Sequence, residues 1–295
     1  MGDYVLSCCS AVDLTKEQME ELGISFIPFH FELNGVLYED DLGKTVPYPE
    51  FYRRMTEGEE TKTSQVNAEE FERYFESFLK EGKDVIHLTL SSGISGTINS
   101  AKLAKDILSE KYPERKLYVV DSLAASGGYG LLMMKLAEMK KEGKGIAQLY
   151  SFAEEHKKKL NHWFFTSDLT FFIKGGRVSK TAGFVGTMLN ICPLLNVDNM
   201  GRLIPREKIR TKKKVINRIV DVMEEKAEDG KEYSGKVLIT QSDCYEDARA
   251  VADLIEERFP NMDGKVMINY IGNLIGSHTG PGTVALFFWG EERVN

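Results

Sequence analysis

The sequence predicts an α/β protein of two domains. We expect a doubly wound parallel sheet over residues 1–160 and an α+β domain with a mixed sheet over residues 161–295. The chain has 295 residues, which is long for a single hydrophobic core. Its first half alternates strand-like and helix-like segments with short connections, the pattern of a parallel sheet covered by helices. After about residue 160, strand-like segments dominate, which favours a mixed sheet.

The first half contains four strand-like and four helix-like segments. The run "DVIHLTL" at 84–90 is almost wholly apolar, as expected of a central parallel strand that is covered on both faces. The helix at 67–82 begins at a capping residue, Asn67, with Glu70 three residues later. The other predicted strands are 4–9, 24–33, which Pro28 interrupts, and 116–122, and the other predicted helices are 15–22, 97–110 and 130–143.

The second half reads as a series of strands with one clear helix. Residues 192–208 predict two strands joined by a turn at 198–201. Further strands are expected at 162–169, 236–242, 265–272 and 282–290, with a helix at 244–259.

Composition excludes several classes of protein. The net charge of −7 argues against nucleic-acid binding, which normally needs a basic excess. No run of about 18 apolar residues predicts a membrane span, and the first residues lack a secretory signal. The four cysteines form no C-x-x-C pair and do not cluster with the five histidines. We therefore expect a cytoplasmic protein with reduced cysteines, no metal site and no cofactor.

The stretch "LSSGISGTINSA" at 90–101 is the strongest candidate for a binding loop, because it places hydroxyls and glycines between a strand and a helix. A serine-hydrolase elbow would need G-x-S-x-G, and here Thr97 stands where the last glycine belongs. A phosphate-binding Walker loop would need a lysine, and none occurs between 91 and 101. The third alternative is an anion clamp formed by the helix N-terminus and the Ser95 hydroxyl.

A second hydroxyl-rich stretch, "TKTSQ" at 61–65, precedes the helix that Asn67 begins. By itself it predicts an ordinary loop. Together with Ser95, its residues Thr63 and Ser64 could converge on one anion.

Three residues of the second half are further candidates. Arg177 follows two glycines and precedes another predicted helix, Arg210 precedes a run of lysines, and His278 lies in a predicted loop, "GSHTGPG". Far along the chain from Thr63 and Ser95, they are expected to act separately from the hydroxyl loops. His278 is equally consistent with a functional and a structural role. His87, inside a predicted strand, is expected to be a core residue.

In this order, the motifs "TSQ", "SSGISGTINSA", "VVDS", "FFIKGGRVS", "LNICPLLNVDNMGR", "KIRTKKK" and "GSHTGPG" resemble the DegV family over about residues 4–290. The resemblance implies two α/β domains with a site for a long-chain fatty acid between them. It also implies a lipid-binding protein rather than an enzyme, which presents its ligand to a separate fatty acid kinase subunit for phospholipid synthesis in bacteria.

The resemblance also implies roles for the candidate residues. The hydroxyls of Thr63, Ser64 and Ser95 would hold the carboxylate, and Arg177, Arg210 and His278 would handle the acyl phosphate or the kinase subunit. One departure occurs at "CCSAVDL", 8–14, where Cys9 replaces the aspartate of the family pattern. Two alternatives stay open: an autonomous hydrolase or phosphotransferase that uses Ser95 or His278, and a regulatory module that senses a lipid.

Overall fold

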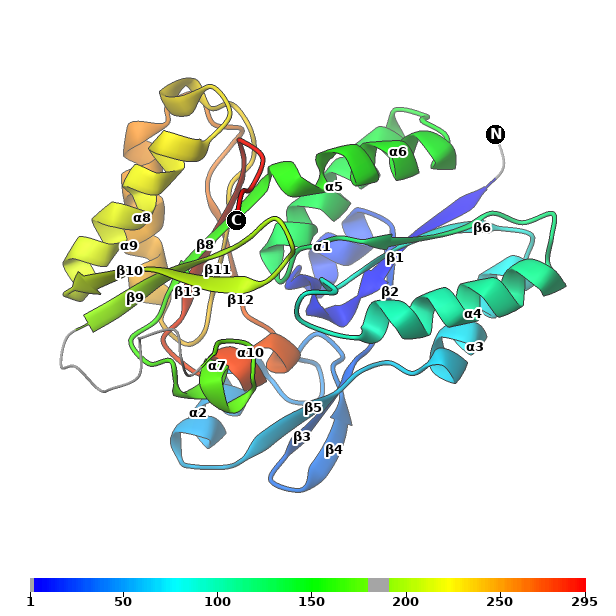
Figure 1. Cartoon of the computed structure of the whole chain (residues 1–295), viewed down its shortest axis with the longest axis horizontal. Coiled ribbons are helices and arrows are strands. Elements are labelled where there is room, and N and C mark those ends of the chain that lie inside the picture. The colour runs from blue at the N-terminus through cyan, green and yellow to red at the C-terminus, as the bar shows by residue number, and fades with distance from the viewer. Residues whose placement is uncertain (1–2, 180–190) are drawn as a thin grey trace.

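The computed structural model describes residues 3–179 and 191–295, and its strands form three sheets (Figure 1). The strand orders are β2-β1-β6-β7, β10-β9-β8-β13-β11-β12 and β4-β3-β5. The strands before residue 160 build the first and third sheets, and those from Leu160 onward build the second.

The four-stranded sheet is parallel throughout, as predicted for the first half. It consists of β1 (Tyr4–Cys9), β2 (Ile24–Ile27), β6 (Asp84–Thr89) and β7 (Leu117–Asp121). In Figure 1, α5 and α6 lie on one side of this sheet and α3 and α4 on the other. Because both faces are covered, β1 and β6 are buried along almost their whole length, which accounts for their apolar sequences.

The helices that contact this sheet are α1 (Lys16–Glu21), α3 (Ala68–Lys80), α4 (Thr97–Lys111), α5 (Gly127–Lys141) and α6 (Ile146–His156). Capping boxes fix where two of them begin. The Asn67 side chain accepts a hydrogen bond from the Glu70 N–H at 3.0 Å, and the Glu70 carboxylate accepts from the Asn67 N–H at 2.7 Å. Thr15 and Gln18 form the same arrangement at α1. Both helix starts follow the prediction.

The six-stranded sheet is mixed, as predicted for the second half. It contains β8 (Leu160–Phe165), β9 (Ile191–Val197), β10 (Leu203–Arg210), β11 (Leu238–Gln241), β12 (Met267–Tyr270) and β13 (Val284–Trp289). Only β11 and β12 pair in parallel. The helices α8 (Lys212–Lys226) and α9 (Tyr245–Arg258) cover one face, whereas α5 contacts β8, β11 and β13. Together the two sheets confirm the predicted fold class.

A small antiparallel sheet contradicts one prediction. Residues 61–65 were expected to form a loop, but Thr61–Ser64 is strand β5, which pairs with β3 (His30–Leu33) beside β4 (Val36–Glu39). Strands β3 and β5 pair antiparallel, with Phe31 opposite Thr63. A sequence of hydroxyls and lysine gives no apolar signal for an edge strand of this kind.

His278 also lies in a different element from the one predicted. Helix α10 (Asn273–Thr279) includes it in its last turn, although the flanking glycines and Pro281 indicated a loop. The sequence analysis also missed α2 (Tyr48–Thr56). A further short helix, α7 (Thr170–Lys174), lies just before Gly175 and Arg177. The helix expected after Arg177 falls on residues 180–190, outside the described residues.

The largest hydrophobic cluster extends from the four-stranded sheet to the inner face of the six-stranded sheet, where it includes Leu238 and Phe287. Helix α5 packs on both sheets and therefore joins them. His87 is fully buried within this cluster, where its Nδ1 bonds the Ser7 hydroxyl at 2.8 Å, as a core histidine should. None of the described helices is long and apolar enough to cross a membrane.

Candidate functional site

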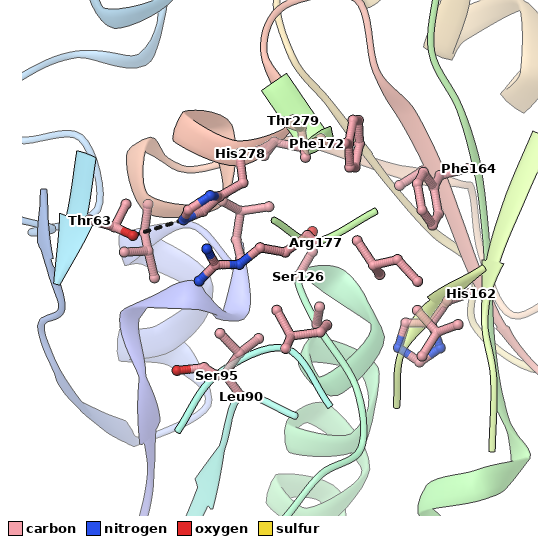
Figure 2. Close-up of a pocket in the computed structure, with 18 of the residues that line it drawn as sticks. Thr63, Leu90, Ser95, Ser126, His162, Phe164, Phe172, Arg177, His278 and Thr279 are labelled. Atoms are coloured by element: carbon pink, nitrogen blue, oxygen red, sulfur yellow. Dashed lines mark hydrogen bonds between the residues drawn. The ribbon is translucent and has the colours of Figure 1, made fainter. Parts of the chain in front are cut away.

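A cavity of about 340 Å³ lies where the three sheets and α10 approach one another (Figure 2). We call it the main cavity. Its wall combines the carboxyl ends of the parallel strands, one face of the six-stranded sheet and the edge strand β5. In open α/β sheets, ligands bind at the carboxyl ends of the strands. The main cavity is lined by Phe29, Thr63, Ser64, Gln65, Leu90, Ile94, Ser95, Gly96, Ala125, Ser126, His162, Phe164, Phe172, Arg177, Val197, Leu203, Ile271, Leu274, Ile275, His278, Thr279, Thr283, Ala285 and Phe287.

One end of the main cavity is polar. Thr63 on β5 and His278 on α10 meet there, with 2.8 Å between Thr63 Oγ1 and His278 Nε2. Figure 2 shows the Arg177 guanidinium pointing toward the same pair. Ser64, Gln65 and Gly96 are exposed, so this end opens to solvent. The fold thus brings residues of both halves together here, although Arg177 and His278 lie far along the chain from the hydroxyl loops, and their separate role stays a prediction.

The hydroxyls of the loop at 91–96 have two roles: that of Ser91 holds the loop against another turn, and that of Ser95 faces the cavity. Ser91 is buried and donates to the Gly201 carbonyl at 2.8 Å, which joins this loop to the turn between β9 and β10. A side chain at Gly93 would collide with that turn, because an added Cβ would lie 2.6 Å from the Gly201 oxygen. Ser95 is half-buried and lines the cavity, and its Oγ accepts a hydrogen bond from the Thr97 N–H at 3.3 Å. The Ser95 O–H remains able to donate to a ligand.

Arg210 is the one candidate side chain that does not line the main cavity. It ends β10 opposite Ile191 and is exposed. The remaining five candidates, Thr63, Ser64, Ser95, Arg177 and His278, all line it.

The charge at the polar end suits an anion. Burial lowers the pKa of Arg177. Burial and the Arg177 charge lower the pKa of His278 to about 4, so this imidazole is neutral at pH 7. Arg177 Nε and His278 Nδ1 are buried without a partner among the described residues. Arg177, the neutral imidazole and the hydroxyls of Thr63, Ser64 and Ser95 therefore line the cavity together, a set of donors suited to one carboxylate or phosphate.

The rest of the cavity is mostly apolar. Phe164 on β8 stacks on Phe172 of α7, with ring centroids 5.6 Å apart, and alternate residues of the neighbouring strands continue the same face. These are Val197, Leu203, Ala285 and Phe287, opposite Leu90, Ile94 and Leu274. His162 lies on the far side from Thr63 and His278 in Figure 2. Such a surface accepts a hydrocarbon chain.

A buried carboxylate fixes Ser126, which lies in the wall of the main cavity. Asp13 accepts hydrogen bonds from the Ser126 hydroxyl and, at 2.9 Å, from the Gly272 N–H. It thereby connects the turn after β1 to α5 and to the segment after β12. Burial raises the pKa of Asp13 to about 8 and that of Asp40 to about 7. Ser126 has φ 54°, an uncommon value for a residue other than glycine.

Cys9, which departs from the family pattern, does not line the main cavity. It is fully buried, and its Sγ lies 3.5 Å from His87 Nε2. The residue therefore belongs to the core beneath the site.

The sequence analysis missed several residues of the cavity wall. Ser126 and His162 gave no signal because they lie in or beside apolar runs, and Thr279 and Thr283 lie in and directly after "GSHTGPG", where only His278 stood out. Phe172, one of the two phenylalanines at 171–172, lines the cavity.

Comparison with known proteins gives a consistent result. Residues 9–291 match the family described as "Uncharacterised protein, DegV family". A DegV domain-containing protein of Clostridium perfringens is 38% identical over 99% of both chains, and a fatty acid-binding protein of Thermotoga maritima is 33% identical over 93% of both. The structure of a DegV family protein from Thermus thermophilus, described by its fatty acid binding, matches with a TM-score of 0.86 at 27% identity, covering 99% of this chain and 100% of that one.

Proposed function

The chain belongs to the DegV family, and from this membership and the main cavity we propose that it binds one long-chain fatty acid. The observation that carries the proposal is the division of the cavity into a polar end that opens to solvent and an apolar remainder that is enclosed. A fatty acid has the same division. Relatives described as binding fatty acids share the fold and most of the chain length.

We further propose that the hydroxyls of Thr63, Ser64 and Ser95 hold the carboxylate. Thr63 and Ser95 come from opposite sides of the polar end, so that one carboxylate could accept a hydrogen bond from each. In this arrangement the boundary between the two domains lies at 160/161. The fatty acid lies between an N-terminal domain that supplies these hydroxyls and a C-terminal domain that supplies much of the apolar wall.

The energetics favour binding. Burying about 15 carbons of a C16 acid gains roughly 12 kcal/mol at about 0.8 kcal/mol each. Immobilising the ligand costs about 4 kcal/mol or more. Burying the head group costs several kcal/mol more unless hydrogen bonds replace its water. The hydroxyls, the imidazole and Arg177 can supply those bonds, so a net gain remains.

Presentation of the bound acid to a kinase subunit is the finer part of the proposal. Arg177 and His278 are placed to meet an acyl phosphate formed at the polar end, and exposed Arg210 could contact the partner. The alternative of an autonomous serine hydrolase finds less support. It needs a histidine beside Ser95, whereas His278 contacts Thr63.

The test is native mass spectrometry of the delipidated protein after incubation with palmitate, followed by a displacement titration. We expect a one-to-one complex. A protein that binds no fatty acid of any chain length would contradict the proposal. Kinase coupling is tested separately, by adding a fatty acid kinase subunit and following acyl-phosphate formation.

A further inference from the structure

A second cavity, of about 430 Å³, lies beyond His162, and we call it the distal cavity. Its apolar wall is formed by Leu131 and Met134 of α5, Phe152 of α6 and Trp289 of β13. Its rim is charged, and several of these charges pair with each other: Lys236 pairs with Asp263 and lies 3.8 Å from Glu138. The four apolar side chains of the distal cavity thus lie among charged ones, which also include Lys159, Glu228 and Asp229.

The two cavities follow one another along the same three elements. Strands β8 and β13 pair antiparallel, with Phe164 opposite Ala285, His162 opposite Phe287 and Leu160 opposite Trp289. The first two pairs line the main cavity, and Trp289 of the third pair lines the distal one. Two strand residues, about 7 Å, therefore separate the last pair of the main cavity from the first pair of the distal cavity.

Helix α5 runs the same way. Ser126, just before its first residue, lines the main cavity, and its inward residues from Leu131 onward line the distal cavity. Between them, Gly127 and Gly128 lie against the sheet. A Cβ added at Gly128 would lie 1.8 Å from His162 Nε2, so the imidazole edge rests directly on the helix backbone.

The His162 ring has little freedom in this position. It is 1% exposed, its Nδ1 lies 3.0 Å from the Leu160 carbonyl, and it meets the Phe287 ring edge-on at 5.4 Å. The carbonyl can only accept, so Nδ1 carries the hydrogen. Nε2 then presents a lone pair to Gly128 and has no hydrogen-bond partner among the described residues. Burial lowers the pKa of His162 far below its usual value, so the ring stays neutral.

From this geometry we propose that His162, seated on Gly128, is the partition that ends the main cavity and thereby sets the longest acyl chain the protein accepts. The inference rests on the proposed fatty acid binding. The distal cavity lies one strand pair further along, past the fully buried Leu160, and a longer chain would reach it only if it passed this residue as well as the position of the ring. At roughly 1.3 Å of advance per carbon, from a C–C bond of about 1.5 Å, the 7 Å step corresponds to about five carbons.

The experiment measures affinity against chain length for saturated acids from C12 to C24. For the wild-type protein, affinity should rise about fourfold per added methylene and then stop rising when the methyl end reaches His162. In His162→Ala the rise should continue for about four or five further carbons. Acids of that length should bind at least tenfold tighter than they bind the wild-type protein.

Three further variants separate bulk from other effects. His162→Leu keeps the bulk without the nitrogens and should keep the wild-type optimum. Phe164→Ala widens the main cavity without removing the partition, so it should weaken all chain lengths without shifting the optimum upward. Gly128→Ala forces the ring toward the ligand and should shift the optimum to shorter acids.

An unchanged optimum in folded His162→Ala would overturn the inference, and so would an equal upward shift in His162→Leu. Should His162→Ala not fold, the downward shift expected for Gly128→Ala decides, and its absence would count against the partition. Failure of the wild-type protein to bind any acid would instead remove the proposed function.

Discussion

The two ends of the main cavity differ in the polarity and in the packing of their side chains. At the polar end, Arg177 Nε and His278 Nδ1 are buried without partners, yet the neighbouring Ser64 and Gln65 are exposed. The apolar end contains Phe164, Phe172 and Phe287. Their strands and helix pack together, and all three side chains belong to the largest hydrophobic cluster. The polar end thus presents hydrogen-bond donors to a ligand, whereas the apolar end is part of the hydrophobic core that stabilises the fold.

This difference predicts that substitutions at the two ends affect different quantities. The largest effect should come from Phe164→Ala, because Phe164 is 6% exposed and stacks on Phe172. Removing such a ring leaves a cavity and should lower the free energy of unfolding by about 3–5 kcal/mol. Denaturant unfolding of the ligand-free protein measures it. A loss no larger than that of Ser95→Ala would contradict the division between the two ends.

At the polar end, Ser95→Ala should act on binding instead. Losing one donor to a charged group should weaken fatty acid affinity by about 1–3 kcal/mol, while the free energy of unfolding changes by less than about 1 kcal/mol. Ser92→Ala is the matched control, since Ser92 belongs to the same loop, is exposed and does not line the cavity. Displacement titrations compare the two variants. Equal affinities would mean that Ser95 serves only its contact with the Thr97 N–H.

The two ends also differ in how many of their residues could be predicted from the sequence. Thr63, Ser64, Ser95, Arg177 and His278 were found because hydroxyls, glycines and cations in short motifs stand out. Their meeting at one place was not, since the strand β5 and the helix α10 that position Thr63 and His278 were both predicted as loops. The apolar end left no local signal, because Phe164 or Ala285 looks like any strand residue until the sheet order is known. Both predicted sheets were correct, because apolar strands of regular length carry a strong pattern.

The buried carboxyl groups of Asp13 and Asp40 should make the stability of the protein depend on pH. Burial raises the pKa of Asp13 to about 8 and of Asp40 to about 7, above the value of about 3.9 expected in the unfolded chain. Between those values the folded protein binds more protons than the unfolded chain, so with respect to these groups the free energy of unfolding should be greatest below about pH 3.9 and fall as the pH rises toward 8. Each group contributes a slope of up to about 1.4 kcal/mol per pH unit.

Asp13→Asn tests this pH dependence. The variant keeps the size of the side chain but cannot ionise, so about half of the pH slope between pH 5 and pH 7 should disappear. Urea unfolding at several pH values provides the measurement. An undiminished slope would mean that Asp13 is already ionised in the folded protein over this range, so that its protonation does not change on unfolding.

The smallest effect is expected at Arg210, which is exposed and lies outside the main cavity. Arg210→Ala should change fatty acid affinity by less than twofold and leave stability unchanged. If Arg210 contacts a kinase subunit, the same variant should slow acyl-phosphate formation in the coupled assay. A clear loss of affinity for the fatty acid would instead place Arg210 at the carboxylate.

The orientation of the bound acid tests the central claim most directly. A crystal of the protein with an acid that carries bromine on its last carbon would locate both ends of the ligand, the tail by anomalous scattering and the carboxylate by its contacts. The account predicts the carboxylate within about 2.5–3.2 Å of the Thr63 and Ser95 hydroxyls or the Arg177 guanidinium, and the bromine against His162 and Phe287. A bromine beside Thr63, or an acid bound outside the main cavity, would contradict it.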